Sequence, residues 1–179
     1  YIGEKPTVKI NNVLAMRNAA GIVAFKNLVL DFEDTATTGN YLINFNGGTD
    51  PGVGTLVFED CEIIYNKESL MSAYNAAGSI GNIIFRNCKI RYTGTSAGFI
   101  FNLSSLGNKF SLDLTKLKSI VVENCIVYST NCSDINCAFL SANSLDLNNL
   151  TLTVENNTFV DFRGSGTTLK NAGTFVLYK

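Results

Sequence analysis

The sequence predicts an all-β chain, folded as a right-handed single-stranded parallel β-helix of about five to six rungs with three short strands each. Three observations predict this fold. A two-strand motif recurs along the chain, a further short strand precedes each copy, and apolar residues alternate with a period of two. Because a strand-turn-strand unit cannot bury its apolar edge alone, the copies must stack.

The recurring motif reads apolar-x-apolar-charged-Asn/Asp-small-x-apolar. It occupies residues 23–30, 56–63, 83–90, 120–127 and 152–159. Measured at the Asn/Asp position, successive copies are 33, 27, 37 and 32 residues apart. Repeat periods in this range are typical of stacked repeat architectures.

Stacking of the copies places equivalent residues in columns about 4.8 Å apart. The inward column before the turn contains Phe25, Phe58, Phe85, Val122 and Val154. The turn column contains Asn27, Asp60, Asn87, Asn124 and Asn156. Asparagine suits this place because its amide can bond the next rung and because it tolerates tight-turn geometry. A column of mostly small residues follows: Leu28, Cys61, Cys88, Cys125 and Asn157.

The outward column before the turn is charged: Lys26, Glu59, Arg86, Glu123 and Glu155. Its first four signs alternate, as cross-strand neighbours prefer. We therefore interpret it as a structural charge ladder.

The strand that precedes each motif ends in an asparagine of its own. We align these leading strands at Asn18, Asn46, Asn75, Asn102 and Asn143, which are 28, 29, 27 and 41 residues apart. This alignment gives three strands and two Asn-marked corners per rung.

Taken in order, residues 1–12 form the tail of a preceding rung or a cap, and the first full rung runs from Val13 to about Phe32. The next four rungs end near Tyr65, Tyr92, Tyr128 and Phe162, and residues 173–178 read as another leading strand. The longest insertion covers residues 103–117. We expect residues 1–179 to form one domain of a longer chain, since an uncapped end would expose a sheet edge.

The five cysteines fall into two groups. Cys61, Cys88 and Cys125 stack in register, with side chains parallel rather than converging, so we expect buried free thiols. Cys132 and Cys137 lie close together in a loop, where a local disulfide is one possibility and two free thiols are the other. A zinc site is not expected, because the chain has no histidine and no CxxC spacing.

The asparagine columns and three-strand rungs resemble the pectate-lyase-like β-helix superfamily. More narrowly, they are similar to uncharacterised β-helix domains of gut-bacterial surface proteins from glycan-utilisation systems. The resemblance covers essentially the whole chain and implies an extracellular or cell-surface location. It implies little about activity, because the superfamily holds lyases, hydrolases, esterases, adhesins and non-catalytic binders.

Catalytic members of this superfamily place carboxylates, and in the hydrolases a histidine, on the outer face of the leading strands. Here the leading strands contain no Asp or Glu, and the chain contains no histidine. Neither a carboxylate pair nor an oxygen-ligand calcium cage can be built there. The sequence therefore favours a domain without catalysis, cofactor or metal.

A stripe precedes the asparagine of each leading strand: Arg17, Phe45, Tyr74 and Phe101, followed by Ala142. If these residues face outward, stacked aromatic rings would suit the C–H faces of sugar rings, and we expect polysaccharide as the ligand. In the alternative, the leading strands have the opposite parity and the stripe belongs to the core. The sequence leaves both parities open.

Three functions follow from these observations. The first is a secreted or surface module that binds polysaccharide without cleaving it. The second is part of a polysaccharide lyase or hydrolase whose catalytic residues lie elsewhere, and the third is a structural or adhesin scaffold without ligand. A net charge of −1 offers no electrostatic case for nucleic acid, and no apolar run is long enough to span a membrane.

Overall fold

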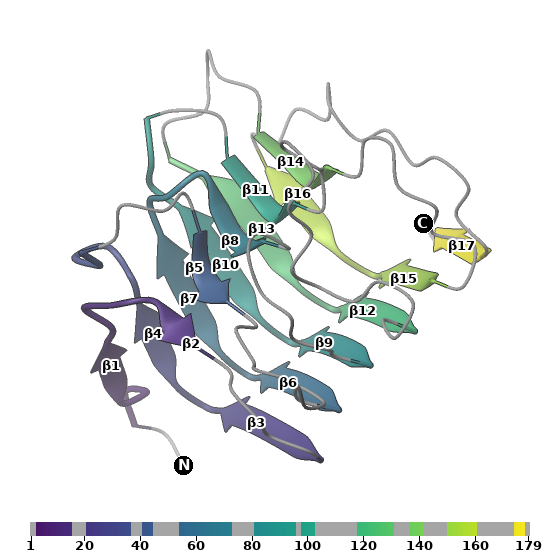
Figure 1. Ribbon diagram of the computed structural model, residues 1–179, viewed down its shortest axis with the longest axis horizontal. Coiled ribbons are helices and arrows are strands. Elements are labelled where there is room, and N and C mark those ends of the chain that lie inside the picture. Colours follow the sequence, from purple (N-terminus) through teal and green to yellow (C-terminus); the bar gives the residue numbers. More distant parts are fainter. Residues whose placement is uncertain are drawn as a thin grey trace.

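The computed structural model describes residues 3–15, 21–36, 41–44, 54–72, 81–95, 98–102, 118–130, 137–141, 150–160 and 174–177. Every regular element in these ranges is a β-strand, and the strands form three parallel sheets (Figure 1). Within the described ranges there is no helix of the length and apolarity that a membrane crossing needs. The all-β class and the parallel pairing predicted from the sequence are confirmed.

Sheet A contains β1 (Thr7–Lys9), β4 (Val29–Asp31), β7 (Glu62–Tyr65), β10 (Lys89–Tyr92), β13 (Ile126–Ser129) and β16 (Thr158–Val160). Sheet B contains β2 (Leu14–Ala15), β5 (Tyr41–Asn44), β8 (Ser69–Ser72), β11 (Gly98–Asn102) and β14 (Cys137–Ser141). Sheet C contains β3 (Ile22–Lys26), β6 (Thr55–Glu59), β9 (Asn82–Arg86), β12 (Ser119–Glu123), β15 (Thr151–Glu155) and β17 (Thr174–Leu177).

The chain visits the sheets in a fixed cycle. From β1 to β15 the order is A, B, C, repeated five times, and β16 and β17 then extend sheets A and C. From β1 to β13, each strand therefore pairs with the strand three places further along the chain, as the rows of strands in Figure 1 show. The strand β17 pairs with β15 in sheet C, so its prediction as a leading strand was wrong.

The predicted two-strand motif is the join between sheets C and A. In register, Phe25, Phe58, Phe85, Val122 and Val154 occupy one inward column of sheet C. The rings of Phe25 and Phe58 stack 5.3 Å apart, and those of Phe58 and Phe85 stack 4.8 Å apart. These distances match the spacing of neighbouring strands, so the aromatic core follows from the register of the sheet.

The turn column joins the two sheets through one strained residue per copy. Asn27, Asp60, Asn87, Asn124 and Asn156 all have φ between 52° and 54°, and no other non-glycine residue among those described has positive φ. The backbone N–H groups of the first four bond to the next repeat, as Asn87 does to the carbonyl of Glu123 at 3.0 Å. The side chain of Asn87 is exposed, and no described hydrogen bond joins side chains within this column. Tight-turn geometry is therefore confirmed as the reason for asparagine, whereas the expected amide ladder is not found here.

Sheet B forms the third wall of the core. Leu42, Ile43, Leu70, Met71, Ile100 and Phe101 are all buried. Phe101 meets Phe85 of sheet C edge to face, with ring centroids 5.9 Å apart, so side chains from different sheets share one core. In β5, β8 and β11, two consecutive residues that point to opposite faces of the sheet are both buried. In sheet C, by contrast, buried and partly exposed residues alternate along the strand, as in β6.

Candidate functional site

The predicted binding stripe is not assembled by the described part of sheet B. Arg17, Phe45 and Tyr74 lie outside the described residues. Phe101 is fully buried and packs against Phe85. At this position the structure therefore has the core parity that the sequence left open as the alternative.

The register of sheet B also differs from the alignment at asparagine. Phe101 pairs with Met71 on one side and Leu140 on the other, instead of aligning with Tyr74 and Ala142. Asn102 pairs with Ser72 and Ser141. The predicted asparagine alignment is therefore wrong at Asn102, and Phe101 does not pair with the residues that this alignment placed beside it.

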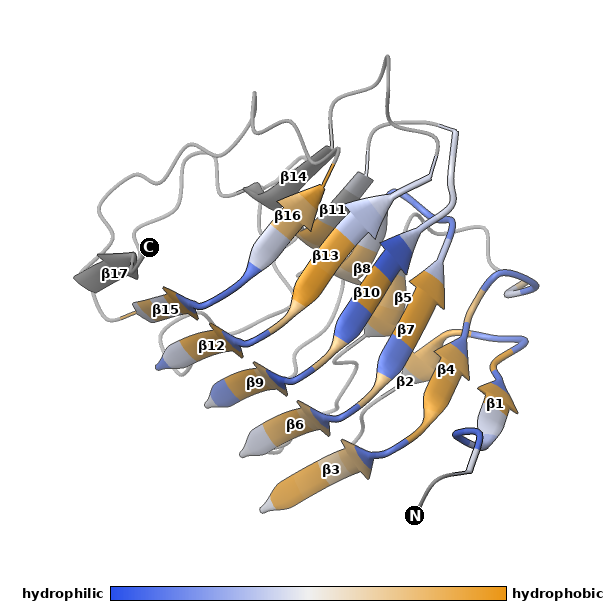
Figure 2. Ribbon diagram, turned by 180° about the vertical axis from the view of Figure 1, so that it is seen from behind, coloured by the Kyte–Doolittle hydropathy of each residue, from blue (hydrophilic) through white to orange (hydrophobic). Residues whose placement is uncertain are grey.

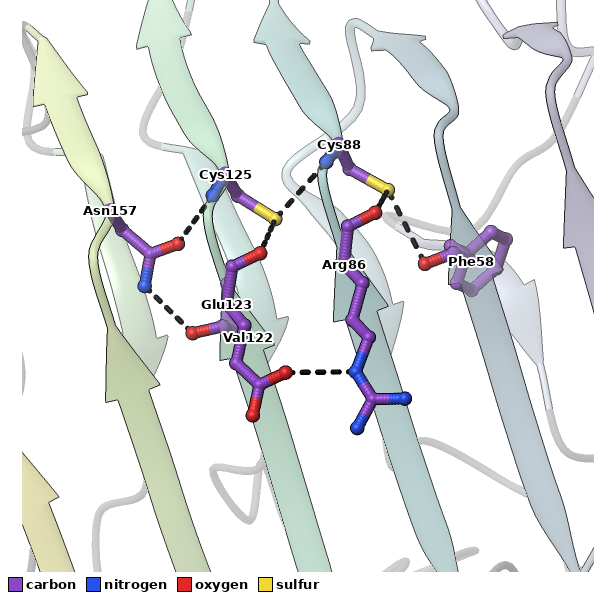
Figure 3. A network of polar contacts seen from close by, with 7 residues as sticks. All are labelled: Phe58, Arg86, Cys88, Val122, Glu123, Cys125 and Asn157. Atoms are coloured by element: carbon purple, nitrogen blue, oxygen red, sulfur yellow. Dashed lines mark hydrogen bonds and ion pairs between the residues drawn. The ribbon is translucent and has the colours of Figure 1, made fainter.

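The densest polar network of the described chain lies at the corner between sheets C and A, in the column predicted to be small (Figure 3). Cys61, Cys88 and Cys125 are free and buried, as predicted. The Cys88 thiol donates to the carbonyls of Arg86 at 3.2 Å and Phe58 at 3.4 Å. The backbone N–H of Cys88 donates to Sγ of Cys125 at 3.3 Å. The thiols thus act as hydrogen-bonding groups between repeats, in addition to filling space.

Asn157 ends this thiol column. Its Oδ1 accepts the N–H of Cys125 at 2.7 Å, and its Nδ2 donates to the carbonyl of Val122 at 2.7 Å (Figure 3). The cysteines divide these connections between them: Sγ of Cys125 accepts the N–H of Cys88 at 3.3 Å, and the thiols of Cys61 and Cys88 donate to the carbonyls of Phe25 at 3.3 Å and Phe58 at 3.4 Å. These bonds are longer because a thiol is a weak donor and a weak acceptor. Asn157 thus joins two repeats through backbone groups, which differs from the ladder of asparagine side chains expected in the turn column.

The surroundings of the first two cysteines in this column, Cys61 and Cys88, favour the neutral thiol over the thiolate. The hydrogen bond with Cys125, and burial, raise the pKa of Cys88 to about 12. The hydrogen bond with Cys88, and burial, also raise the pKa of Cys61. The pKa of Cys125 is lowered, mainly by its hydrogen bond with Cys88. Since the thiolate is the reactive form, Cys61 and Cys88 are poorly suited to nucleophilic or redox chemistry.

Four residues of the charge ladder beside the corner form two ion pairs, as their alternating signs predicted. Lys26 lies 2.5 Å from Glu59, and Arg86 lies 2.8 Å from Glu123. The hydrogen bond from Lys26 holds the pKa of Glu59 below its usual value, and the hydrogen bond to Glu123 raises the pKa of Arg86. Because the acids are already paired, they are structural groups rather than candidates for acid–base catalysis.

The outer face of sheet A carries exposed apolar and basic side chains together. We name as the basic-aromatic patch the residues Lys89, Arg91, Ile126, Tyr128 and Val160 of β10, β13 and β16. Ile126 is 48% exposed and Val160 is 45% exposed, which makes them two of the most exposed large apolar side chains of the described ranges. Figure 2 views sheet A from this side; the ribbon of β10 is blue towards both ends, and that of β13 is orange in its first part and pale towards its arrowhead.

Strand pairing sets the geometry of the basic-aromatic patch. Lys89 pairs with Ile126, and Arg91 pairs with Tyr128, which in turn pairs with Val160. The Lys89 ammonium lies 5.5 Å from the centre of the Tyr128 ring and 3.6 Å from the Glu62 carboxylate. The Nε of Arg91 is shielded from solvent and has no hydrogen-bond partner within the described chain.

The sequence analysis did not select this face. Its signal was present in the copies of the motif, because the residues one and three places after the small column alternate outward: Lys89 and Arg91, then Ile126 and Tyr128.

In the described ranges, no group of three or more Cys, Asp or Glu side chains is placed to hold a metal ion. Comparison of the chain with protein-family models, curated proteins and solved structures found no match.

Proposed function

We propose that the protein is a right-handed parallel β-helix that binds polysaccharide without cleaving it, at a cell surface or outside the cell. The cyclic visiting order of the three parallel sheets supports the β-helix, since each rung contributes one strand to each sheet. Parallel crossover connections are right-handed in nearly all proteins, which supports the hand. The extracellular location rests on the resemblance to surface domains of glycan-utilisation systems.

The observation that carries the polysaccharide proposal is the basic-aromatic patch. Tyr128 is half-buried on the outer face of a parallel sheet, between the paired residues Arg91 and Val160. An aromatic ring held on a flat, regular face can pack against the C–H face of a sugar, while neighbouring polar groups bond its hydroxyls. A chain of sugars could contact several strands of such a face.

The ion pairs of three acids in sheets A and C support binding without catalysis. Glu59, Glu62 and Glu123 each lie within 4 Å of a lysine or arginine nitrogen, at 2.5, 3.6 and 2.8 Å respectively. Glycoside hydrolysis needs two carboxyl groups that flank the substrate and exchange protons with it. Acids fixed in ion pairs with exposed bases are a poor starting point for that chemistry.

Native affinity electrophoresis against neutral and acidic polysaccharides tests the proposal. The wild type is compared with Tyr128→Ala on the outer face of sheet A and Tyr74→Ala in the stripe predicted from the sequence. We expect at least one polysaccharide to slow the wild type, and we expect Tyr128→Ala to remove most of that retardation.

The two variants separate the possible sites. If only Tyr74→Ala loses retardation, the binding site lies on the leading strands instead. Equal migration of the wild type through every gel would contradict polysaccharide binding and favour the ligand-free scaffold. Release of unsaturated or reducing sugars by the protein would favour the lyase or hydrolase instead.

A further inference from the structure

We propose that Arg91 anchors an anionic group of the bound ligand, so that the basic-aromatic patch selects sugars bearing a carboxylate or a sulfate ester. This inference rests on the proposed function and specifies its ligand. It concerns the outer face of sheet A and uses no metal ion.

The position of Arg91 is unusual for a surface arginine. It is half-buried, and its strand neighbours are Ile64 on one side and Tyr128 on the other. Its Nε is covered by the protein and has no hydrogen-bond partner in the described part of the chain. A guanidinium that is partly removed from water without a partner carries a desolvation cost that an incoming anion would offset.

The neighbouring charges leave Arg91 uncompensated. Glu62 is paired with Lys89 at 3.6 Å, and both belong to the adjacent outward column. Asp31 is in the same column as Arg91, but Ile64 lies between them, and its Oδ1 accepts the backbone N–H of Glu33 at 3.0 Å. By contrast, Lys9, Lys26, Arg86 and Lys89 each have a carboxylate partner. Arg91 is thus the cation of this face that an external anion would suit best.

The surrounding side chains define the ligand's chemistry. The planar guanidinium matches carboxylate and sulfate oxygens with two parallel hydrogen bonds. The paired Tyr128 ring offers an apolar surface beside that anchor, and the Lys89 ammonium lies 5.5 Å from the ring centre. A sugar ring resting on Tyr128 would direct its acidic substituent towards Arg91.

The test measures binding of the full chain to three soluble polymers: alginate, which carries carboxylates, dextran sulfate, which carries sulfate esters, and unmodified dextran. The variants are Arg91→Gln, Arg91→Lys and the matched control Lys118→Gln, which removes an exposed positive charge from another part of the molecule. Circular dichroism establishes that each variant is folded before binding is compared.

We expect the wild type to bind one or both anionic polymers and to bind dextran more weakly. Arg91→Gln should weaken anionic binding about tenfold or more, Arg91→Lys should restore only part of it, and Lys118→Gln should leave it almost unchanged. The polymer that shows this pattern identifies the anion as carboxylate or sulfate.

Two results would overturn the inference while leaving polysaccharide binding in place. One is equal weakening by Arg91→Gln and Lys118→Gln, which would indicate a general effect of charge. The other is tight binding to dextran that Arg91→Gln does not change. If no polymer binds the wild type, in this assay or by electrophoresis, the inference and the proposed function both fail.

Discussion

At the scale of single residues, the fold depends on one left-handed residue per repeat. The five residues of the turn column have φ values within a range of two degrees, and each joins a strand of sheet C to a strand of sheet A. Asparagine and aspartate reach this region with less strain than other side chains, and glycine reaches it with none. This column could be predicted from sequence because few residue types tolerate the geometry.

Replacement of Asn87 tests the role of this geometry. We expect Asn87→Ala to lower the free energy of unfolding by about 1–2 kcal/mol, because alanine is strained at a φ of 52°. Asn87→Gly should be close to the wild type, since glycine adopts this φ freely. Urea denaturation of the three proteins measures the difference. Equal destabilisation by alanine and glycine would instead assign the role to the asparagine side chain.

The hydrogen bonds made by the thiol column were not predicted from the sequence. The sequence identified Cys61, Cys88 and Cys125 as buried and free, which the structure confirms. It treated them as small apolar residues, because the weak donor and acceptor capacity of sulfur becomes important only when carbonyls lie within reach. Such carbonyls lie 3.2 Å and 3.4 Å from the thiol of Cys88.

The raised pKa of the buried thiols makes stability depend on alkaline pH. In the unfolded chain a cysteine ionises near a pH of about 8.5, whereas Cys88 in the folded chain retains its proton until about 12. Above a pH of about 8.5, the unfolded state binds fewer protons than the folded state does. The stabilisation that comes from the protonated Cys88 thiol is therefore complete below that pH, and it is lost as the pH rises towards the pKa of the folded state.

We therefore expect the wild type to lose stability between pH 9 and pH 11, and the Cys61→Ser/Cys88→Ser variant to lose less over the same interval. The variant starts from a lower stability at neutral pH, so the slopes are the quantity to compare. Urea midpoints at a series of pH values provide them. Parallel slopes would show that the thiols do not contribute to the alkaline loss.

At the scale of the elements, the prediction succeeded where the repeat was regular. The recurring motif supplies strands of sheets A and C. All five predicted rung ends lie within two residues of the ends of β4, β7, β10, β13 and β16, as Tyr65 and Tyr92 show. Sheet B differs, because its strands follow loops of unequal length and its asparagines do not mark a common register. Phe101 pairs with Met71 and Leu140, both apolar, so burial of the core outweighed the asparagine spacing.

Gly98 controls how closely sheets A and B approach each other. A Cβ atom added there would lie 2.6 Å from Cε1 of Tyr92, a fully buried ring. We expect Gly98→Ala to destabilise the protein by about 1–3 kcal/mol, because the core must move to accept the methyl group. Thr95→Ala, at a nearby exposed position, should change stability much less. Thermal unfolding compares them, and an unchanged midpoint for Gly98→Ala would contradict the close approach.

At the scale of the whole molecule, the three parallel sheets differ in how far their side chains are exposed. Within the described ranges, consecutive side chains of β5, β8 and β11 in sheet B are buried, whereas the outer face of sheet A exposes Ile126 and Val160 beside Arg91 and Tyr128. The fold class was accessible from sequence because stacking imposes a period. The sheet face that could bind a ligand could not be predicted from the sequence, because its exposure depends on which outward column of side chains the rest of the chain covers.

The central claim is that the outer face of sheet A binds polysaccharide, and an isotope-labelled amide NMR spectrum titrated with soluble oligosaccharides tests it most directly. The account predicts shifts concentrated in β10 and β13, from Lys89 to Tyr92 and from Ile126 to Ser129, with little change at the corner between sheets C and A. A spectrum that stays unchanged with every sugar, or shifts confined to sheet B, would contradict it.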